Sequence, residues 1–412
     1  MLHDFLHNFE HNLFKPLLLF FYFGFLLALT KVDFEFPYVI YQGLTMYLLL
    51  AIGWHGGEEL AAIKASSIAG IVGFMVLGFA LNFVIGVLAY LLLSRLTGLR
   101  QIDNATVAGY YGSDSAGTFA TCVAILISVG LAFDAYMPVM LAVMEVPGCL
   151  VALYLVARLR HKGMDAEGNM PGEPGYLAPP VPAKAAPGAA ARPHPGQRLE
   201  DAESAGGIAQ KLDFSLADRR EPSAETIAEI DEKPPLFSAQ LFREVFLNPG
   251  LLLLFGGIAI GFISGLQGHK VTHDDDTFFV SAFQGALCLF LLEMGMTAAR
   301  KLRDLRSAGR GFIFFGLVAP NLFAPLGIIV AHVYAYLTGI HFDPGTYILF
   351  AVLCGASSYI AVPAVQRLAI PEASPTLPLA ASLGLTFSYN VTIGIPLYIE
   401  IAKLIARWFP GT

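Results

Sequence analysis

Ten long apolar stretches recur along the chain and restrict what it can fold into. Each is close to the roughly 20 residues that a helix needs to cross the hydrocarbon core of a bilayer. Their approximate ranges are 13–30, 36–54, 67–94, 104–130, 136–158, 245–266, 277–298, 311–338, 344–368 and 376–406. The sequence therefore predicts an all-α polytopic membrane protein with ten transmembrane helices.

Charge is scarce outside one segment of the chain. Only 14% of the 412 residues are charged, whereas a soluble domain carries about 25%. Of these charged residues, 22 lie between Arg160 and Gln240, so too few remain elsewhere to cover a soluble enzyme. The net charge of -7 argues against nucleic-acid binding. The four cysteines lie in apolar runs without metal-ligand spacing, so we expect no enzyme, no cofactor and no metal other than sodium.

The charged segment separates two halves of similar hydropathy. It is rich in Pro, Ala and Gly and then in charged residues, a composition that cannot bury enough apolar surface to form a core. The sequence predicts a first five-helix repeat at 1–158, a flexible cytoplasmic insert at 159–243 and a second five-helix repeat at 244–412.

Short matches between the halves indicate an internal repeat. Gln42-Gly43 and Gly53 match Gln284-Gly285 and Gly295 at an offset of 242 residues. Leu96-Thr97-Gly98 matches Leu337-Thr338-Gly339 at an offset of 241, and Asp103 and Thr106 match Asp343 and Thr346 at 240. Because five crossings are an odd number, the second repeat enters from the opposite side of the membrane. The two repeats are therefore expected to be inverted, as in many secondary transporters.

The distribution of basic residues predicts the orientation in the membrane. Ten Lys and Arg residues lie in loops on the side of the insert, and five lie on the other side. By the positive-inside rule the insert is cytoplasmic and both termini face outward. We expect a multi-pass protein of the plasma (inner) membrane.

The fourth and ninth spans are each interrupted near their middle by small and polar residues. The interruptions read Gly112-Ser113-Asp114-Ser115-Ala116-Gly117-Thr118 and Gly355-Ala356-Ser357-Ser358-Tyr359. At the offset of 240, residues 115–118 fall on residues 355–358, so the interruptions occupy equivalent places in the two repeats. We therefore predict that helices 4 and 9 are broken at the midplane of the membrane.

Broken helices can build an ion site. The backbone N–H groups at a break have no partner in the helix and carry the positive end of the half-helix dipole. Two such ends that meet at the repeat interface bind a small anion, and hydroxyl groups can donate to its oxygens. Close helix packing through small residues is the alternative explanation for one such motif. The candidate anion-binding residues are Gly112, Ser113, Ser115, Ala116, Gly117, Thr118, Gly355, Ala356, Ser357, Ser358 and Tyr359.

Asp114 is the residue that most strongly indicates ion binding. An ionised carboxylate at mid-depth costs at least about 2.5–3.5 kcal/mol unless it is paired or hydrated. No basic residue occupies that depth in the sequence, so a cation or a proton is the expected partner. Glu145 precedes Pro147 and ranks next, whereas Glu293 suits a helix-end role as well as an ionic one. The candidate sodium-binding residues are Asp114, Glu145, Ser113, Ser357 and Asn390.

With these motifs in order, the chain resembles the sodium-dependent bicarbonate transporter family of the SbtA type over all ten spans. The best local matches are the break around 112–118, Glu145-Val146-Pro147, Met294-Gly295-Met296 before a basic stretch, and Ala356-Ser357-Ser358 leading to Arg367. The resemblance implies an inverted five-plus-five fold, a homotrimer and bicarbonate held between the broken helices with sodium nearby. It also implies a small cytoplasmic signalling protein of the nitrogen-regulator type as a partner. By match, Ser113, Ser115, Gly117, Thr118, Ser357 and Ser358 line the site, and Glu145 replaces an acidic residue that helps to hold sodium.

The chain departs from the family at two positions of the site. The family typically has Asp where this chain has Tyr359, and an apolar residue where this chain has Asp114. One hypothesis is that the carboxylate has moved across the pseudo-two-fold axis and that the total charge of the site is conserved. Otherwise the site takes a different substrate.

The sequence thus favours a secondary active transporter that takes up bicarbonate with sodium. The alternatives are a sodium- or proton-coupled carrier of another small carboxylate and a non-transporting membrane sensor.

Overall fold

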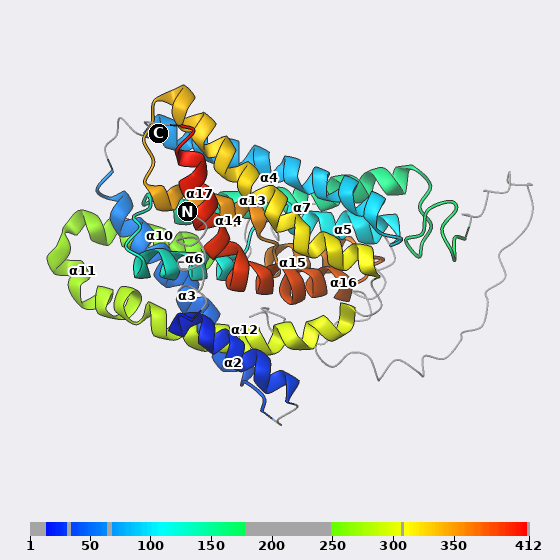
Figure 1. The fold of residues 1–412 in the computed structure, drawn as a ribbon, viewed down its shortest axis with the longest axis horizontal. Coiled ribbons are helices and arrows are strands. Elements are labelled where there is room, and N and C mark those ends of the chain that lie inside the picture. The colour runs from blue at the N-terminus through cyan, green and yellow to red at the C-terminus, as the bar shows by residue number, and fades with distance from the viewer. Residues whose placement is uncertain (1–13, 31–33, 64–67, 178–248, 306–308, 410–412) are drawn as a thin grey trace, which may run out of the picture.

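The computed structural model describes residues 14–30, 34–63, 68–177, 249–305 and 309–409 (Figure 1). Within these ranges the chain forms helices and loops and contains no β-strand, so the all-α prediction is confirmed there. Residues 178–248, which include most of the predicted insert at 159–243, lie outside the described residues.

The helices fall into two groups on either side of the insert. The first group is α2 (Pro16–Leu29), α3 (Tyr38–Leu60), α4 (Ile68–Leu96), α5 (Gln101–Tyr111), α6 (Ala116–Ser128) and α7 (Met137–His161). The second group is α10 (Pro249–Gln267), α11 (His269–Asp276), η4 (Thr277–Ser281), α12 (Phe283–Asp304), α13 (Arg310–Thr338), α14 (Pro344–Gly355), α15 (Ala361–Ala369), α16 (Thr376–Leu379), η6 (Ala380–Phe387), η7 (Asn390–Gly394) and α17 (Ile395–Ala406). The elements labelled η are π-helical turns.

Not every predicted span is a long helix. Six helical segments of the described chain are long and apolar enough to cross a membrane. They are Ile68–Leu96, Met137–His161, Pro249–Gln267, Val271–Leu302, Arg310–Thr338 and Thr376–Ala406. The α2 and α14 helices are apolar but shorter. The chain is therefore helical and membrane-like, and the total of ten crossings stays a prediction.

Glycines bring two pairs of distant helices into close contact. A Cβ on Gly53 of α3 would lie 2.5 Å from the Leu254 carbonyl oxygen of α10, and one on Gly257 of α10 would lie 2.7 Å from the Leu50 carbonyl oxygen of α3. A Cβ on Gly295 of α12 would likewise meet the backbone of α2. These two helices cross along one edge of the molecule (Figure 1). Small residues of this kind let helix backbones approach each other in a membrane, where apolar burial against lipid contributes little.

The remaining long helices enclose the two interrupted ones. The first break packs against α4 and α7 through three glycines, because a Cβ on Gly112 would lie 3.0 Å from the Gly86 Cα and 3.3 Å from the Gly148 Cα. In the second half, a Cβ on Gly355 would lie 2.8 Å from the Ala324 Cβ of α13. Both breaks are therefore held deep in the fold by close packing of small residues.

Candidate functional site

The first interruption separates α5 from α6. The α5 helix ends at Tyr111, and the N–H of Gly112 donates to the Ala108 carbonyl. Residue Ser115 is extended and caps α6, since its hydroxyl accepts the Thr118 N–H at 3.2 Å and the Thr118 hydroxyl at 2.9 Å. A serine cap satisfies one of the free N–H groups at a helix start. The predicted break thus turns one apolar span into two short helices.

The second interruption lies directly against the first. The α14 helix ends at Gly355, and the chain is non-helical from Ala356 until α15 begins at Ala361. The N–H of Ser358 donates to the Tyr110 carbonyl at 2.8 Å, which joins the two breaks backbone to backbone. Segments that are about 250 residues apart in the chain therefore form one polar region.

Several side chains in this region are buried without a hydrogen-bond partner. Both carboxylate oxygens of Asp114 and the hydroxyls of Ser357 and Ser358 make no hydrogen bond in the described structure, and Asp114 has no exposed surface. Buried polar groups of native proteins are bonded in the great majority of cases. Unpartnered buried acceptors and donors on the two breaks are the arrangement expected of a ligand site, and a ligand there stays a prediction.

Glu145 lies close to Asp114. The two carboxylates interact electrostatically, and the Ser113 hydroxyl donates to the Glu145 backbone carbonyl at 2.8 Å. Pro147 stands inside α7 and has no N–H, so the helix cannot complete its hydrogen-bond ladder at this point. The backbone of α7 is thus linked to the first break where the acidic pair lies.

The predicted site residues do not all have the same surroundings. The structure brings residues 112–118 and 355–359 together, with Glu145 beside them. Asn390 donates to the Gly355 carbonyl at 2.9 Å and accepts from the Tyr398 hydroxyl at 2.7 Å, so its amide holds the end of α14. Glu293 is half-buried and accepts from the Thr297 hydroxyl at 2.9 Å. Which of these residues bind an ion stays a prediction.

Three polar residues that the sequence analysis did not select support the breaks. The Asn82 amide donates to the Met144 carbonyl, and the Ser382 hydroxyl lies 2.5 Å from the Ser358 carbonyl to which it donates. Gln366 accepts from the Tyr110 hydroxyl at 2.8 Å. The only sequence signal for them is a polar residue inside an apolar span, and their partners lie far away in the chain.

The chemistry of the region suits a small anion and a small hard cation. In the described part of the chain, no three His, Cys, Asp or Glu residues gather as they would around a transition metal. The donors present are carboxylates, hydroxyls and backbone carbonyls, which are the ligands that bind sodium at broken helices. The residues therefore fit sodium as a transported ion.

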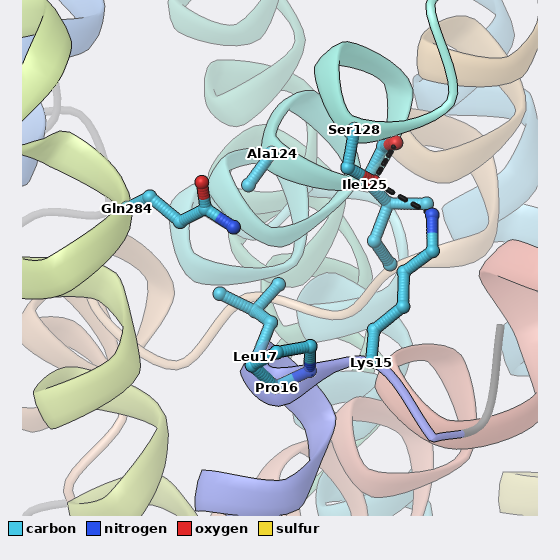
Figure 2. Close-up of a pocket in the computed structure, with 7 residues that line it drawn as sticks. All are labelled: Lys15, Pro16, Leu17, Ala124, Ile125, Ser128 and Gln284. Atoms are coloured by element: carbon cyan, nitrogen blue, oxygen red, sulfur yellow. Dashed lines mark hydrogen bonds between the residues drawn. The ribbon is translucent and has the colours of Figure 1, made fainter.

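A cavity of ≈ 210 Å³ lies at the far end of α6 from the break (Figure 2). Its lining is Lys15, Pro16, Leu17, Ala124, Ile125, Ser128 and Gln284. The Lys15 ammonium donates to the Ser128 hydroxyl at 2.6 Å. Because Ala124 and Ser128 line it and α6 begins at Ala116, the cavity lies about 12–18 Å along the helix from the break. It lies where α2 and α12 meet the end of the half-helix.

The chain was compared with known proteins. A sequence model described as the Na⁺-dependent bicarbonate transporter superfamily matches residues 16–403. A comparison with curated proteins gives no match. The matched range spans both helical groups and both interruptions.

Proposed function

Because the chain belongs to the Na⁺-dependent bicarbonate transporter superfamily, and so to a family of transporters rather than enzymes, we propose that it is a sodium-coupled bicarbonate carrier. The transported ions bind between the two broken helices. The observation behind this proposal is the junction of the breaks by the Ser358–Tyr110 hydrogen bond, with Asp114, Ser357 and Ser358 buried and unpartnered beside it.

The proposed mechanism follows from the positive N-terminal end of α6 and the negative carboxylates beside it. Bicarbonate binds at the N-terminal end of α6, where free N–H groups and the Ser115 hydroxyl, which so far only accepts, can donate to its oxygens. Sodium binds at the carboxylates of Asp114 and Glu145. Each ion offsets the charge of the other, which lowers the cost of crossing the membrane. Coupling requires that the empty and fully loaded forms change conformation more readily than the half-loaded forms.

We also propose that the two helical groups are inverted repeats. Gly53 and Gly295 correspond at the offset of 242 residues, and each presses its helix onto the first helix of the other half. Gly43 and Gly285 correspond at the same offset, and a Cβ on either would meet nothing within 4 Å. Two matched pairs with matched surroundings support a pseudo-two-fold relation. The homotrimer, the inner-membrane orientation and the nitrogen-regulator-type partner stay predictions.

The test is uptake of labelled bicarbonate into proteoliposomes with and without an inward sodium gradient. Alkaline pH and early time points keep CO₂ diffusion small, and protein-free liposomes give the background. We expect sodium-dependent uptake that falls strongly in Ser358→Ala and is unchanged in Ser281→Ala, which alters an exposed serine of η4. Uptake of acetate or lactate instead of bicarbonate would favour another carboxylate carrier. If no small anion is transported, the carrier is excluded and the non-transporting membrane sensor remains as the interpretation.

A further inference from the structure

The hydroxyl of Tyr359 lies over the N-terminus of α6. Tyr359 belongs to the second break, whereas Gly117 is in the first turn of α6. A Cβ built on Gly117 would collide with the Tyr359 hydroxyl oxygen, and the next nearest atoms belong to Phe290 at 3.0 Å. Glycine at 117 is thus what allows this oxygen to approach the start of the helix.

The Tyr359 hydroxyl lies at the start of α6 but makes no hydrogen bond there. The Ser115 hydroxyl and the Gly117 N–H are the hydrogen-bonding groups that face it. Neither meets the geometry of a hydrogen bond, and Tyr359 Oη has no partner in the described structure although it is buried. A buried hydroxyl without a partner is less stable than one that is hydrogen-bonded. The oxygen is therefore near the free helix N–H groups and is weakly held.

Aromatic rings close the region around it. The Tyr359 ring packs edge-to-face on Phe387 with centroids 5.7 Å apart, and Phe290 stacks on Tyr41 at 5.8 Å. These rings come from four different elements of the two halves: the second break, η6, α12 and α3. A bound anion needs the same N-terminal end of α6 that the tyrosine oxygen fills.

We propose that Tyr359 is a tethered competitor of the substrate, whose hydroxyl oxygen takes the anion's place in the empty carrier and withdraws when the anion binds. The inference rests on the proposed function, since it assigns the anion to the α6 N-terminus. A neutral phenol oxygen can lie at a helix N-terminus as a weak acceptor, and a charged anion is favoured there by the dipole. The substrate therefore displaces the hydroxyl, and Tyr359 sets its affinity.

The first test is Tyr359→Phe, which keeps the ring and its contact with Phe387. Because no hydroxyl oxygen then has to leave the N-terminal end of α6, the KM for bicarbonate is expected to fall about twofold or more, from the lower end of what one hydrogen-bonding group contributes, with Vmax within about twofold. The equilibrium Kd of labelled bicarbonate on the purified protein falls in the same way. Tyr154→Phe, which alters an exposed tyrosine of α7, is the control and keeps wild-type values. An unchanged or raised KM in Tyr359→Phe overturns the proposal.

A second test uses the collision at Gly117. Gly117→Ala places a methyl group where the tyrosine oxygen lies, so the empty carrier can no longer hold the hydroxyl over the start of α6. The variant is therefore expected to bind bicarbonate more tightly than the wild type, as Tyr359→Phe does. In the Tyr359→Phe background the oxygen is already absent, so adding Gly117→Ala should give no further gain. Weaker binding in Gly117→Ala, or the same gain in both backgrounds, contradicts the proposal. Absence of sodium-dependent bicarbonate uptake in the wild type instead contradicts the proposed function, so the two failures are distinct.

Discussion

The side chain of Asp114 lies in an environment that is unusual for a charged residue. It is fully buried and its two oxygens bond nothing in the described structure, while Glu145 is near enough to repel it. Two carboxylates in a low-dielectric region are strongly unfavourable unless a cation or a proton accompanies them. Asp114 is therefore where cation coupling should be most sensitive to a change of charge.

We predict that Asp114→Asn abolishes or greatly weakens the sodium dependence of uptake. Asparagine has nearly the same shape, so the fold is retained, but the charge that attracts the cation is lost. The sodium concentration for half-maximal uptake should rise by about tenfold or more, which corresponds to about 1.4 kcal/mol. The measurement is bicarbonate uptake against sodium concentration in proteoliposomes.

Asp275→Asn is the matched control for this experiment, because Asp275 is an exposed carboxylate in α11. It should leave the sodium curve unchanged. If Asp114→Asn also left the curve unchanged while Tyr359→Asp strengthened it, the hypothesis that the carboxylate has moved from 359 to 114 would be wrong.

At the level of single residues, sequence patterns indicate residue types but not contacts. Asp114, Ser357 and Ser358 stood out because polar residues are expensive in an apolar span, and the structure shows them buried and unpartnered. The Tyr359–Gly117 approach could not be predicted, because it depends on how two segments far apart in the sequence meet. Asn390 is a predicted sodium ligand, and that role stays a prediction; the sequence did not indicate that its amide bonds the Gly355 carbonyl and the Tyr398 hydroxyl. Short-range patterns thus show which residues are costly, and not what they face.

At the scale of elements, one loop of the second half is fixed by the first half. The loop after α15 carries Glu372, whose carboxylate accepts from the Arg160 guanidinium at 3.0 Å. Arg160 also donates to the Ala369 carbonyl, and Arg100 donates to the Glu372 carbonyl at 3.2 Å. The C-terminal end of α7 and the start of α5 therefore anchor the element that follows the second break.

We expect Glu372→Gln to lower the stability of the fold and the rate of transport. The variant leaves the Arg160 guanidinium partly buried without its charge partner, and removal of one such partner costs about 1–3 kcal/mol. Arg160 keeps about a fifth of its side-chain surface exposed, so the lower part of this range applies because solvent screens the charge. Thermal unfolding in detergent and Vmax should both fall, with KM for bicarbonate little changed.

The control for the loop is Glu167→Gln, since Glu167 is exposed and only its backbone carbonyl bonds Arg100. It should match the wild type in both measurements. A normal melting temperature in Glu372→Gln would mean that the ion pair does not hold the loop. In the sequence the basic residues of this region indicate only membrane orientation, because an ion pair across 212 residues has no local signature.

The two halves of the whole molecule are related by their glycines more clearly than by any long sequence match. The offset of 242 residues pairs Gly53 with Gly295 and Gly43 with Gly285. The sequence showed only this correspondence. The structure adds that the first pair is crowded by the backbone of another helix and that the second pair is open. Periodicity could predict the repeat, but the choice of neighbour for each helix depends on packing between segments distant in the chain.

This relation makes a prediction with internal controls. Gly53→Ala and Gly295→Ala should each destabilise the protein, because the new methyl group meets backbone atoms of α10 or α2 that cannot move independently. Overpacking of this kind typically costs about 1–3 kcal/mol. Gly43→Ala and Gly285→Ala should be neutral or slightly stabilising, since alanine is favoured over glycine inside a helix by about 1 kcal/mol and the space is open.

Thermal unfolding of the four variants in one detergent compares the halves directly. If the halves are inverted repeats, Gly53→Ala and Gly295→Ala should lose similar stability, and Gly43→Ala and Gly285→Ala should lose none. The reason is that corresponding glycines then make equivalent helix contacts from opposite sides of the membrane. A large loss in Gly53→Ala with none in Gly295→Ala would show that the halves pack differently. The pseudo-two-fold relation would then fail, and with it the reason for expecting the two breaks to contribute equivalent half-helices to one ion site.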